Sequence, residues 1–109
     1  MNIEELKEKL KKRESLQGAD LHGLDLRNLN FRGADLREVN FRGANLEGAN
    51  FQGADLFVAN LQGANLWRAD LEGADFREAN LQGAKFRGTL MDDSLKKKLT
   101  RSQRRDNEY

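Results

Sequence analysis

The apolar residues of this chain recur every five positions through most of its length. From Leu16 to Phe86, every fifth residue is Leu or Phe without exception. Every alanine stands two residues before one of these apolar positions, and Leu or Val takes that place in three other repeats. The residue directly before an apolar position is Asp or Asn almost throughout, and all ten glycines stand two residues after one. One five-residue pattern therefore governs residues 14–90.

Neither a helix nor an ordinary strand accommodates this period. On an α-helix, residues five apart are rotated by about 500° from one another, so the apolar positions would scatter around the cylinder. On a strand, an odd period sends successive apolar residues to opposite faces. A chain that turns once every five residues keeps all of them inside. Glycine suits the corners of such a chain, because it reaches a positive φ without steric cost.

The repeats also carry a recognisable motif, seen in GADL at 18–21 and 53–56, GANL at 43–46, GANF at 48–51 and GADF at 73–76. These segments resemble the pentapeptide-repeat family, whose consensus is A(D/N)LXX. The resemblance implies an all-β solenoid, namely a right-handed quadrilateral parallel β-helix with four pentapeptides in each coil. The repeats would then make about 3.75 coils.

If four pentapeptides make one coil, residues twenty apart stack on one another. An inner column would then contain Leu16, Leu36, Leu56 and Phe76. Outer polar ladders would contain Asp35, Asp55 and Asp75 in one case, and Asn40, Asn60 and Asn80 in another. We expect these ladder side chains to accept hydrogen bonds from backbone amides at the turns.

Residues 1–13 predict a helix that caps the first coil. Asn2 can begin the helix, and Ile3, Leu6 and Leu10 form a narrow apolar stripe. A stripe this narrow is stable only against another surface, as in the terminal caps of repeat proteins.

Residues 91–109 predict a second capping helix followed by a disordered tail. Asp92 or Asp93 can begin this helix, in which Met91, Leu95 and Leu99 repeat every four residues. The tail from residue 102 onwards is expected to be disordered. Because covered ends hide the unpaired edges of the solenoid, we expect a monomer.

Charge and composition exclude several classes of protein. Residues 1–13 carry five Lys and Arg against three Glu, residues 91–109 carry six basic against four acidic residues, and residues 14–90 carry eight against eleven. This balance predicts neither a nucleic-acid partner nor a strongly acidic mimic of nucleic acid. The chain has no Cys and no apolar run of the ~20 residues that a membrane span needs. We therefore expect a cytoplasmic protein without disulfides or membrane contact.

No set of residues predicts catalysis, a metal site or a cofactor. The single histidine, His22, follows an apolar position and should face outward, and no second His or any Cys accompanies it. The ladder of Asp35, Asp55 and Asp75 could hold a hard cation, but the same positions are structural in the repeat. No Ser or Thr is matched to a base, and the glycines serve turns rather than a phosphate loop. The outward arginines from Arg27 to Arg42 encircle the coil and form no groove.

Three apolar residues break the repeat at outward positions, namely Phe57, Val58 and Trp67. Phe57 and Val58 belong to one face, and Trp67, half a coil later, belongs to the opposite face. One interpretation is that the rings pack against arginines one coil away, as cation–π pairs. These arginines would be Arg37 and Arg77 for Phe57, and Arg87 for Trp67. The other interpretation is that the three residues are candidate anchors for a protein partner.

The leading hypothesis is a non-enzymatic scaffold or protein-binding module whose partner is unknown. A second hypothesis follows from the family, some members of which resemble B-form DNA and inhibit or protect topoisomerases such as gyrase. Those members are long, acidic dimers joined through a hydrophobic C-terminus, and this chain departs from them in each respect. A third hypothesis is a structural or designed repeat with no evolved partner.

Overall fold

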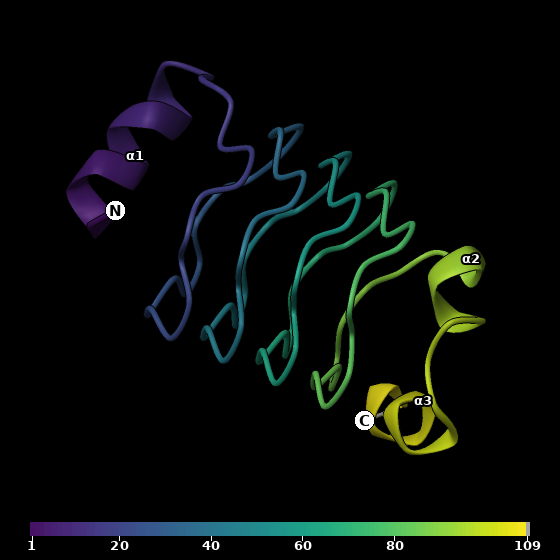
Figure 1. Ribbon diagram of the computed structural model, residues 1–109. Coiled ribbons are helices and arrows are strands. Elements are labelled where there is room, and N and C mark those ends of the chain that lie inside the picture. The colour runs from purple at the N-terminus through teal and green to yellow at the C-terminus, as the bar shows by residue number, and fades with distance from the viewer. Residues whose placement is uncertain (109) are drawn as a thin grey trace.

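The computed structural model describes residues 1–108 of the chain. It contains three helices, α1 (Ile3–Lys11), α2 (Asp93–Lys96) and α3 (Arg101–Asn107). Between α1 and α2 the chain winds into stacked coils, with α1 at one end of the stack and α2 and α3 at the other (Figure 1). The molecule measures 37 × 21 × 18 Å. In this described part of the chain, no helix has the length and apolar character needed to cross a membrane.

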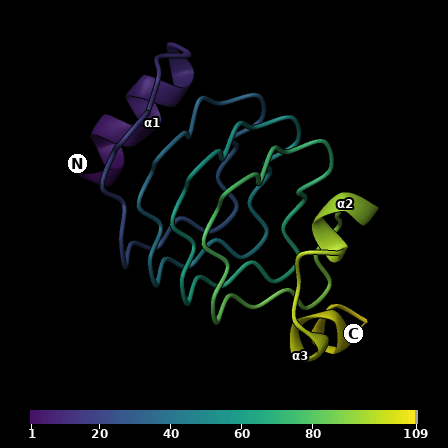
Figure 2. The same ribbon diagram turned by 45° about the vertical axis from the view of Figure 1, so that its right-hand side comes forward.

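The coils are joined by backbone bridges between residues twenty apart. Each bridge is parallel and isolated, from Asp20 with Asn40 to Asp70 with Leu90. The bridges fall into four columns, which start at residues 20, 25, 30 and 35 and give the stack its four sides. Figure 2 shows the open centre of the coil trace, which side chains fill. The predicted stacking of residues twenty apart is therefore present.

A turn at each corner brings the next apolar residue back inside. In one example, the amide of Ala44 donates to the carbonyl of Phe41 at 2.9 Å, and Gly43 between them has a φ of 65°. A positive φ at the third residue is the mark of a type II turn. The side chain of Asn40 accepts a hydrogen bond from the amide of Arg42 at 3.0 Å. Equivalent bonds occur at Asp35, Asp55, Asp75, Asn60 and Asn80, which confirms the prediction for both polar ladders.

The inside of the coils is a single apolar core. Phe31 and Phe51, twenty residues apart, stack with their ring centroids 5.0 Å apart and their planes at 7°. Phe41 packs edge-on against both rings, at 5.7 and 5.9 Å. Alanines such as Ala54 and Ala64 are fully buried beside the larger residues. The core is narrow, so a larger side chain at these alanines would overpack it.

The first end of the stack is in contact with α1. The side chain of Asn2 accepts a hydrogen bond from the amide of Glu5 at 2.8 Å, which begins the helix as predicted. Leu6 is fully buried, and Ile3 and Leu10 are partly buried against the same core. The helix therefore meets the coils through its apolar stripe.

The other end differs from the prediction made for residues 91–109. The predicted single helix is only the short α2, and α3 occupies the segment that was expected to be disordered. A capping box starts α3, because Thr100 and Gln103 each accept a hydrogen bond from the other's backbone amide. The prediction of disorder was wrong up to residue 108, and Tyr109 lies outside the described residues.

Side chains of residues 92–108 take the places that a further coil would fill. In the stack, backbone amides at the apolar and corner positions donate to carbonyls of the next coil. In the last coil, the amide of Phe86 donates instead to the carboxylate of Asp106 at 3.1 Å. The amide of Gly73 likewise donates to the carboxylate of Asp92 at 2.9 Å. Gln103 and Asn107 donate to backbone carbonyls of the same coil at 2.8–3.2 Å. These contacts hold α3 in place.

Candidate functional site

One corner of the solenoid lacks glycine in three successive coils. All ten glycines have φ between 65° and 74°, and each lies at a corner. Five corner positions hold another residue with the same left-handed backbone, namely Asn28, Glu38, Val58, Arg68 and Glu78. Three of these, Glu38, Val58 and Glu78, stack on one corner at intervals of twenty residues. We call residues 37–38, 57–58 and 77–78 the Val58 corner.

Val58 is the most strained residue of this corner. Its φ is 63°, a value that is uncommon for any residue with a side chain and a genuine outlier for a β-branched one. Its side chain is nevertheless 43% exposed, so burial in the core does not account for its presence. The left-handed conformation costs an L-residue about 1–2 kcal/mol. The solenoid would be more stable with glycine here.

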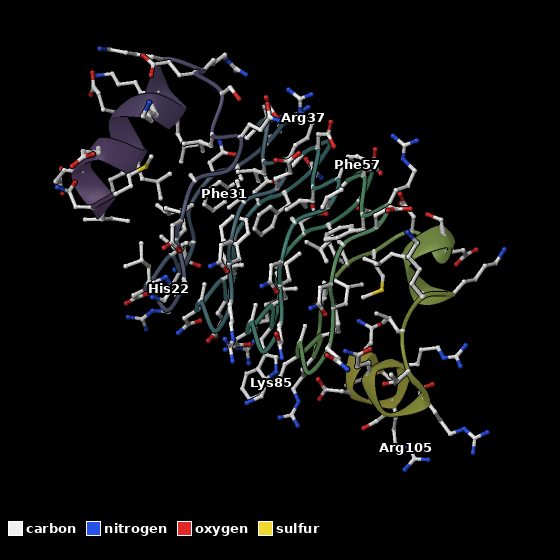
Figure 3. The ribbon with its side chains drawn as sticks, in the orientation of Figure 1. His22, Phe31, Arg37, Phe57, Lys85 and Arg105 are labelled. Carbon is white, nitrogen blue, oxygen red and sulfur yellow. The ribbon has the colours of Figure 1, made fainter. Side chains whose placement is uncertain are left out.

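Phe57, directly before Val58, is partly covered by an arginine from the next coil. The guanidinium carbon of Arg77 lies 5.5 Å from the centroid of the Phe57 ring, which confirms this predicted cation–π pair. Within the described residues Arg37 makes no equivalent contact, and its guanidinium binds the carboxylate of Asp35 at 2.7 and 2.8 Å. Figure 3 shows Arg37 and Phe57 on the same side of the stack.

The acidic side chains at the corner are of two kinds. Asp35 and Asp75 are held by Arg37 and Arg77, and hydrogen bonds from these guanidinium groups keep the pKa of each carboxyl below its ordinary value. Within residues 1–108, the carboxylates of Glu38 and Glu78 lack any such partner. The corner thus presents an apolar centre between two carboxylates that make no ion pair or hydrogen bond in the described structure.

The second corner with missing glycines has an explanation inside the molecule. Arg68 forms an ion pair with Glu47, with Nη1 2.8 Å from Oε1. Asn28 is a residue type that tolerates the left-handed conformation. The Val58 corner differs from this one, because its left-handed residues Glu38 and Glu78 form no ion pair within residues 1–108.

Trp67 follows Asn65, which forms a backbone bridge with Lys85. Figure 3 labels Lys85 on the side of the stack opposite Phe57. The guanidinium carbon of Arg87 is 4.8 Å from the centroid of the Trp67 ring, as predicted. The indole Nε1 is buried without a hydrogen-bond partner in the described structure. Trp67 also lines a cavity of about 540 Å³ beneath α3. The sequence predicted that Trp67 lies on the face opposite Phe57 and Val58, and the three residues indeed do not form one patch. Their role in binding a partner stays a prediction.

The remaining candidates form no reactive arrangement. His22 is exposed, and its Nδ1 lies 2.7 Å from a carboxylate oxygen of Asp20, which lowers the pKa of that carboxyl. Among residues 1–108, no three His, Cys, Asp or Glu side chains form a group suited to a metal ion.

Sequence reasoning identified Val58 but not its neighbours Glu38 and Glu78. Val58 was noticed because it is an apolar residue in an outward position. The glutamates occupy glycine positions of the same column, and this signal was readable from the sequence. Charged side chains at a corner are easily taken for an ordinary solvated surface.

Known pentapeptide repeat proteins are similar to this chain in both sequence and structure. The profile of the pentapeptide repeats matches eight copies over residues 15–53 and 54–93. A pentapeptide repeat protein from the Arabidopsis thaliana thylakoid lumen matches with a TM-score of 0.73 and 37% identity, over 76% of this chain and 57% of its own. A comparison with curated protein sequences gave no significant match.

Two cyanobacterial structures are also similar. HetL from Nostoc sp. strain PCC 7120, a pentapeptide repeat protein involved in heterocyst differentiation regulation, matches with a TM-score of 0.71 and 40% identity, over 74% of this chain and 38% of its own. Another pentapeptide repeat protein from Nostoc PCC 7120 matches with a TM-score of 0.70 and 33% identity, over 84% of this chain and 96% of its own. The chain spans little more than half of the Arabidopsis protein and less of HetL. These neighbours support the predicted right-handed quadrilateral β-helix.

Proposed function

Because the chain belongs to the pentapeptide-repeat family, we propose that it is a non-enzymatic module that binds a protein partner at the Val58 corner. The observation that carries this proposal is Val58 itself, an exposed β-branched residue held in a left-handed conformation. Strained residues that the fold does not need are concentrated at functional sites. A partner that covers Val58 would offset the cost of its conformation.

The charges around Val58 define the chemistry of this partner. Arg37 and Arg77 are already compensated by Asp35 and Asp75. Glu38 and Glu78 remain available one coil below and one coil above Val58. The fitting partner therefore offers an apolar contact with Lys or Arg on either side, and its binding should weaken as salt screens these charges.

A monomer is the form that we propose for the free protein. A helix lies at each end of the stack (Figure 1), which supports this form because it hinders a second copy from pairing with the last backbone of either end. The sides of the stack, which include the Val58 corner, stay accessible to a partner.

The test compares binding by the native protein and by two variants in a pull-down from the source organism. Val58→Gly removes the apolar side chain and should raise the free energy of unfolding by about 1 kcal/mol, because glycine adopts this conformation without strain. Phe57→Gln removes the aromatic ring. Glutamine is compatible with the fold here, because the same turn position holds Gln52, Gln62 and Gln82 in other repeats. The matched control is Gln62→Arg, on another side of the same coil.

The expected result is a protein that is retained by the native chain and by Gln62→Arg and lost with both corner variants. Its affinity is then measured with the purified proteins, at increasing salt. A partner that binds Val58→Gly and Phe57→Gln as tightly as the native chain would exclude the corner. Trp67→Gln, tested in parallel, reports on the opposite side of the stack.

A further inference from the structure

A cavity of about 390 Å³ lies between the end of α1 and the first coil. This volume is within the range of about 300–1,000 Å³ that is usual for small-molecule sites. Lys11 and Arg13 line it from the helix side, and Arg32 and Asp35 line it from the coil. Figure 3 labels Arg37, the partner of Asp35, near the end of the stack that faces α1.

The charge of this cavity is not balanced. The side chains of Lys11, Arg13 and Arg32 make no ion pair or hydrogen bond within residues 1–108. Two carboxylates also line the cavity, but both have partners. Glu14 lies 3.3 Å from the ammonium group of Lys9, and Asp35 is held by Arg37. Three cations are therefore left without a counter-charge around one hollow.

The position of Arg13 is set by the motif that ends α1, and arginine is an unusual residue type at this position. The amide of Glu14 donates to the carbonyl of Lys9 at 2.9 Å, and the amide of Arg13 donates to that of Leu10 at 3.1 Å. This is the Schellman arrangement, in which the left-handed residue is usually glycine. Arg13 occupies that position with a φ of 58°. The helix would end more favourably with glycine, so the end of the helix does not account for Arg13.

We propose that this cavity binds a small, multiply charged anion, a phosphoester or a polycarboxylate, through Lys11, Arg13 and Arg32. The planar guanidinium groups of two arginines match the geometry of phosphate and carboxylate oxygens, and lysine adds a point charge. Leu10 and Ala34 provide an apolar wall for the rest of the ligand. The proposal is independent of the Val58 corner and of a protein partner.

The test is a titration of the isotope-labelled full chain, followed by the amide signals in NMR spectra. Pyrophosphate and citrate are the two probes, each at constant ionic strength set with sodium chloride. Saturable shifts are expected for amides of residues 10–14 and 30–35. The probe that binds more tightly identifies the class of ligand, phosphoester or polycarboxylate.

Two variants separate binding from folding. Arg13→Gly should melt at the same or a higher temperature than the native chain and should bind the probe at least about tenfold more weakly, the size expected for loss of one charge-assisted contact. Arg32→Gln should weaken binding similarly. The matched control is Arg42→Gln, which removes an arginine at the same turn position two pentapeptides later, away from the cavity. This control should bind like the native chain.

Three results would overturn the proposal. The first is a shift that grows linearly with probe concentration, since a specific site saturates. The second is a response that is as large around Arg42 as around residues 30–35. The third is native-like affinity in both Arg13→Gly and Arg32→Gln.

Discussion

The two ends of the solenoid meet their helices through different interactions. At the first end, α1 places Leu6 in the core, and within residues 1–108 the hydrogen bonds and the ion pair that leave residues 1–13 reach no further than Glu14. At the other end, Leu95 and Leu99 are buried, and side chains of residues 92–108 also bind backbone groups of the last coil. Beyond Glu14, α1 therefore contacts the coils through apolar side chains, whereas α2 and α3 combine apolar contact with hydrogen bonds.

This difference determines how specific each contact is. Apolar contact is non-directional. It therefore keeps α1 against the first coil but constrains the orientation of the helix only weakly. Hydrogen bonds to defined carbonyls and amides permit one position of α3 only. The C-terminal end therefore imitates the next coil of the ladder, whereas the N-terminal end contacts the first coil through apolar side chains and leaves a cavity of about 390 Å³ beside them.

The largest effect is expected from Leu6→Ala. This change leaves a cavity under α1 and should lower the free energy of unfolding by about 2–5 kcal/mol, measured by urea denaturation. Because no hydrogen bond of the described residues ties α1 to the chain beyond Glu14, its backbone amides should also lose protection against hydrogen exchange.

Leu99→Ala is the matched change at the other end, where Leu99 is 4% exposed. Here α3 should remain protected, because Gln103 and Asn107 still bind the last coil. If Leu99→Ala released α3 while Leu6→Ala left α1 protected, the distinction between the two ends would be wrong.

The hydrogen bonds of the C-terminal end are tested by the double change Gln103→Leu and Asn107→Leu. Four backbone carbonyls, those of Leu81, Ala84, Phe86 and Thr89, would lose a donor. The carbonyls of Leu81 and Phe86 would still accept from the amides of Ala84 and Thr89, so those of Ala84 and Thr89 are the two left without a donor. The expected loss is about 1–3 kcal/mol, in the range for groups left unsatisfied. Circular dichroism and hydrogen exchange should show that α3 melts while the coils stay folded. Arg104→Gln, on the exposed side of α3, is the control and should change neither.

The coils could be predicted from the sequence because one local rule is repeated. Apolar residues, small residues and turn residues each keep their own place in the period of five, so every repeat supports the same prediction. The tail could not be predicted in this way. Gln103 and Asn107 order it by binding backbone groups about twenty residues earlier, which no local pattern shows. The capping box of Thr100 and Gln103 is present in the sequence, but the charged residues around it favour a prediction of disorder.

The candidate sites were predictable only in part, for a related reason. Phe57 and Val58 were identified because they interrupt an outward column. The left-handed backbone of Glu38 and Glu78 follows from the same column and could have been deduced. Arg13 could not, because its conformation depends on how α1 ends.

A smaller loss of stability than that of the Gln103 and Asn107 double change is expected from a substitution at Thr100, where α3 begins. Thr100→Ala removes the side chain that accepts a hydrogen bond from the amide of Gln103 at 3.1 Å. Loss of such a cap costs about 1 kcal/mol. Thermal unfolding should show this decrease, and hydrogen exchange should locate it in the first turn of α3. Thr100→Ser keeps the hydroxyl and should restore the native value. Equal melting of all three proteins would mean that the last coil, and not the capping box, holds α3.

The smallest effect is the loss of folding stability at low pH. It compares Asp35, near the first end of the stack, with Asp75, in the same ladder near the other end. Hydrogen bonds from Arg37, and then from Ser15, keep the pKa of Asp35 below its ordinary value, and Arg77 does the same for Asp75. A pKa that is lower in the folded than in the unfolded chain contributes stability above the unfolded value of about 3.9, and this contribution is lost as the pH falls below it. Urea denaturation between pH 7 and pH 2.5 should therefore show a decrease that is shallower in Asp35→Asn and Asp75→Asn. Asp35→Asn should have the larger effect of the two, because only Asp35 also binds Ser15, the residue that leads from α1 into the first coil. An acid response that is identical in the native chain and in both variants would show that these carboxylates are equally accessible to protons in the folded and unfolded chain.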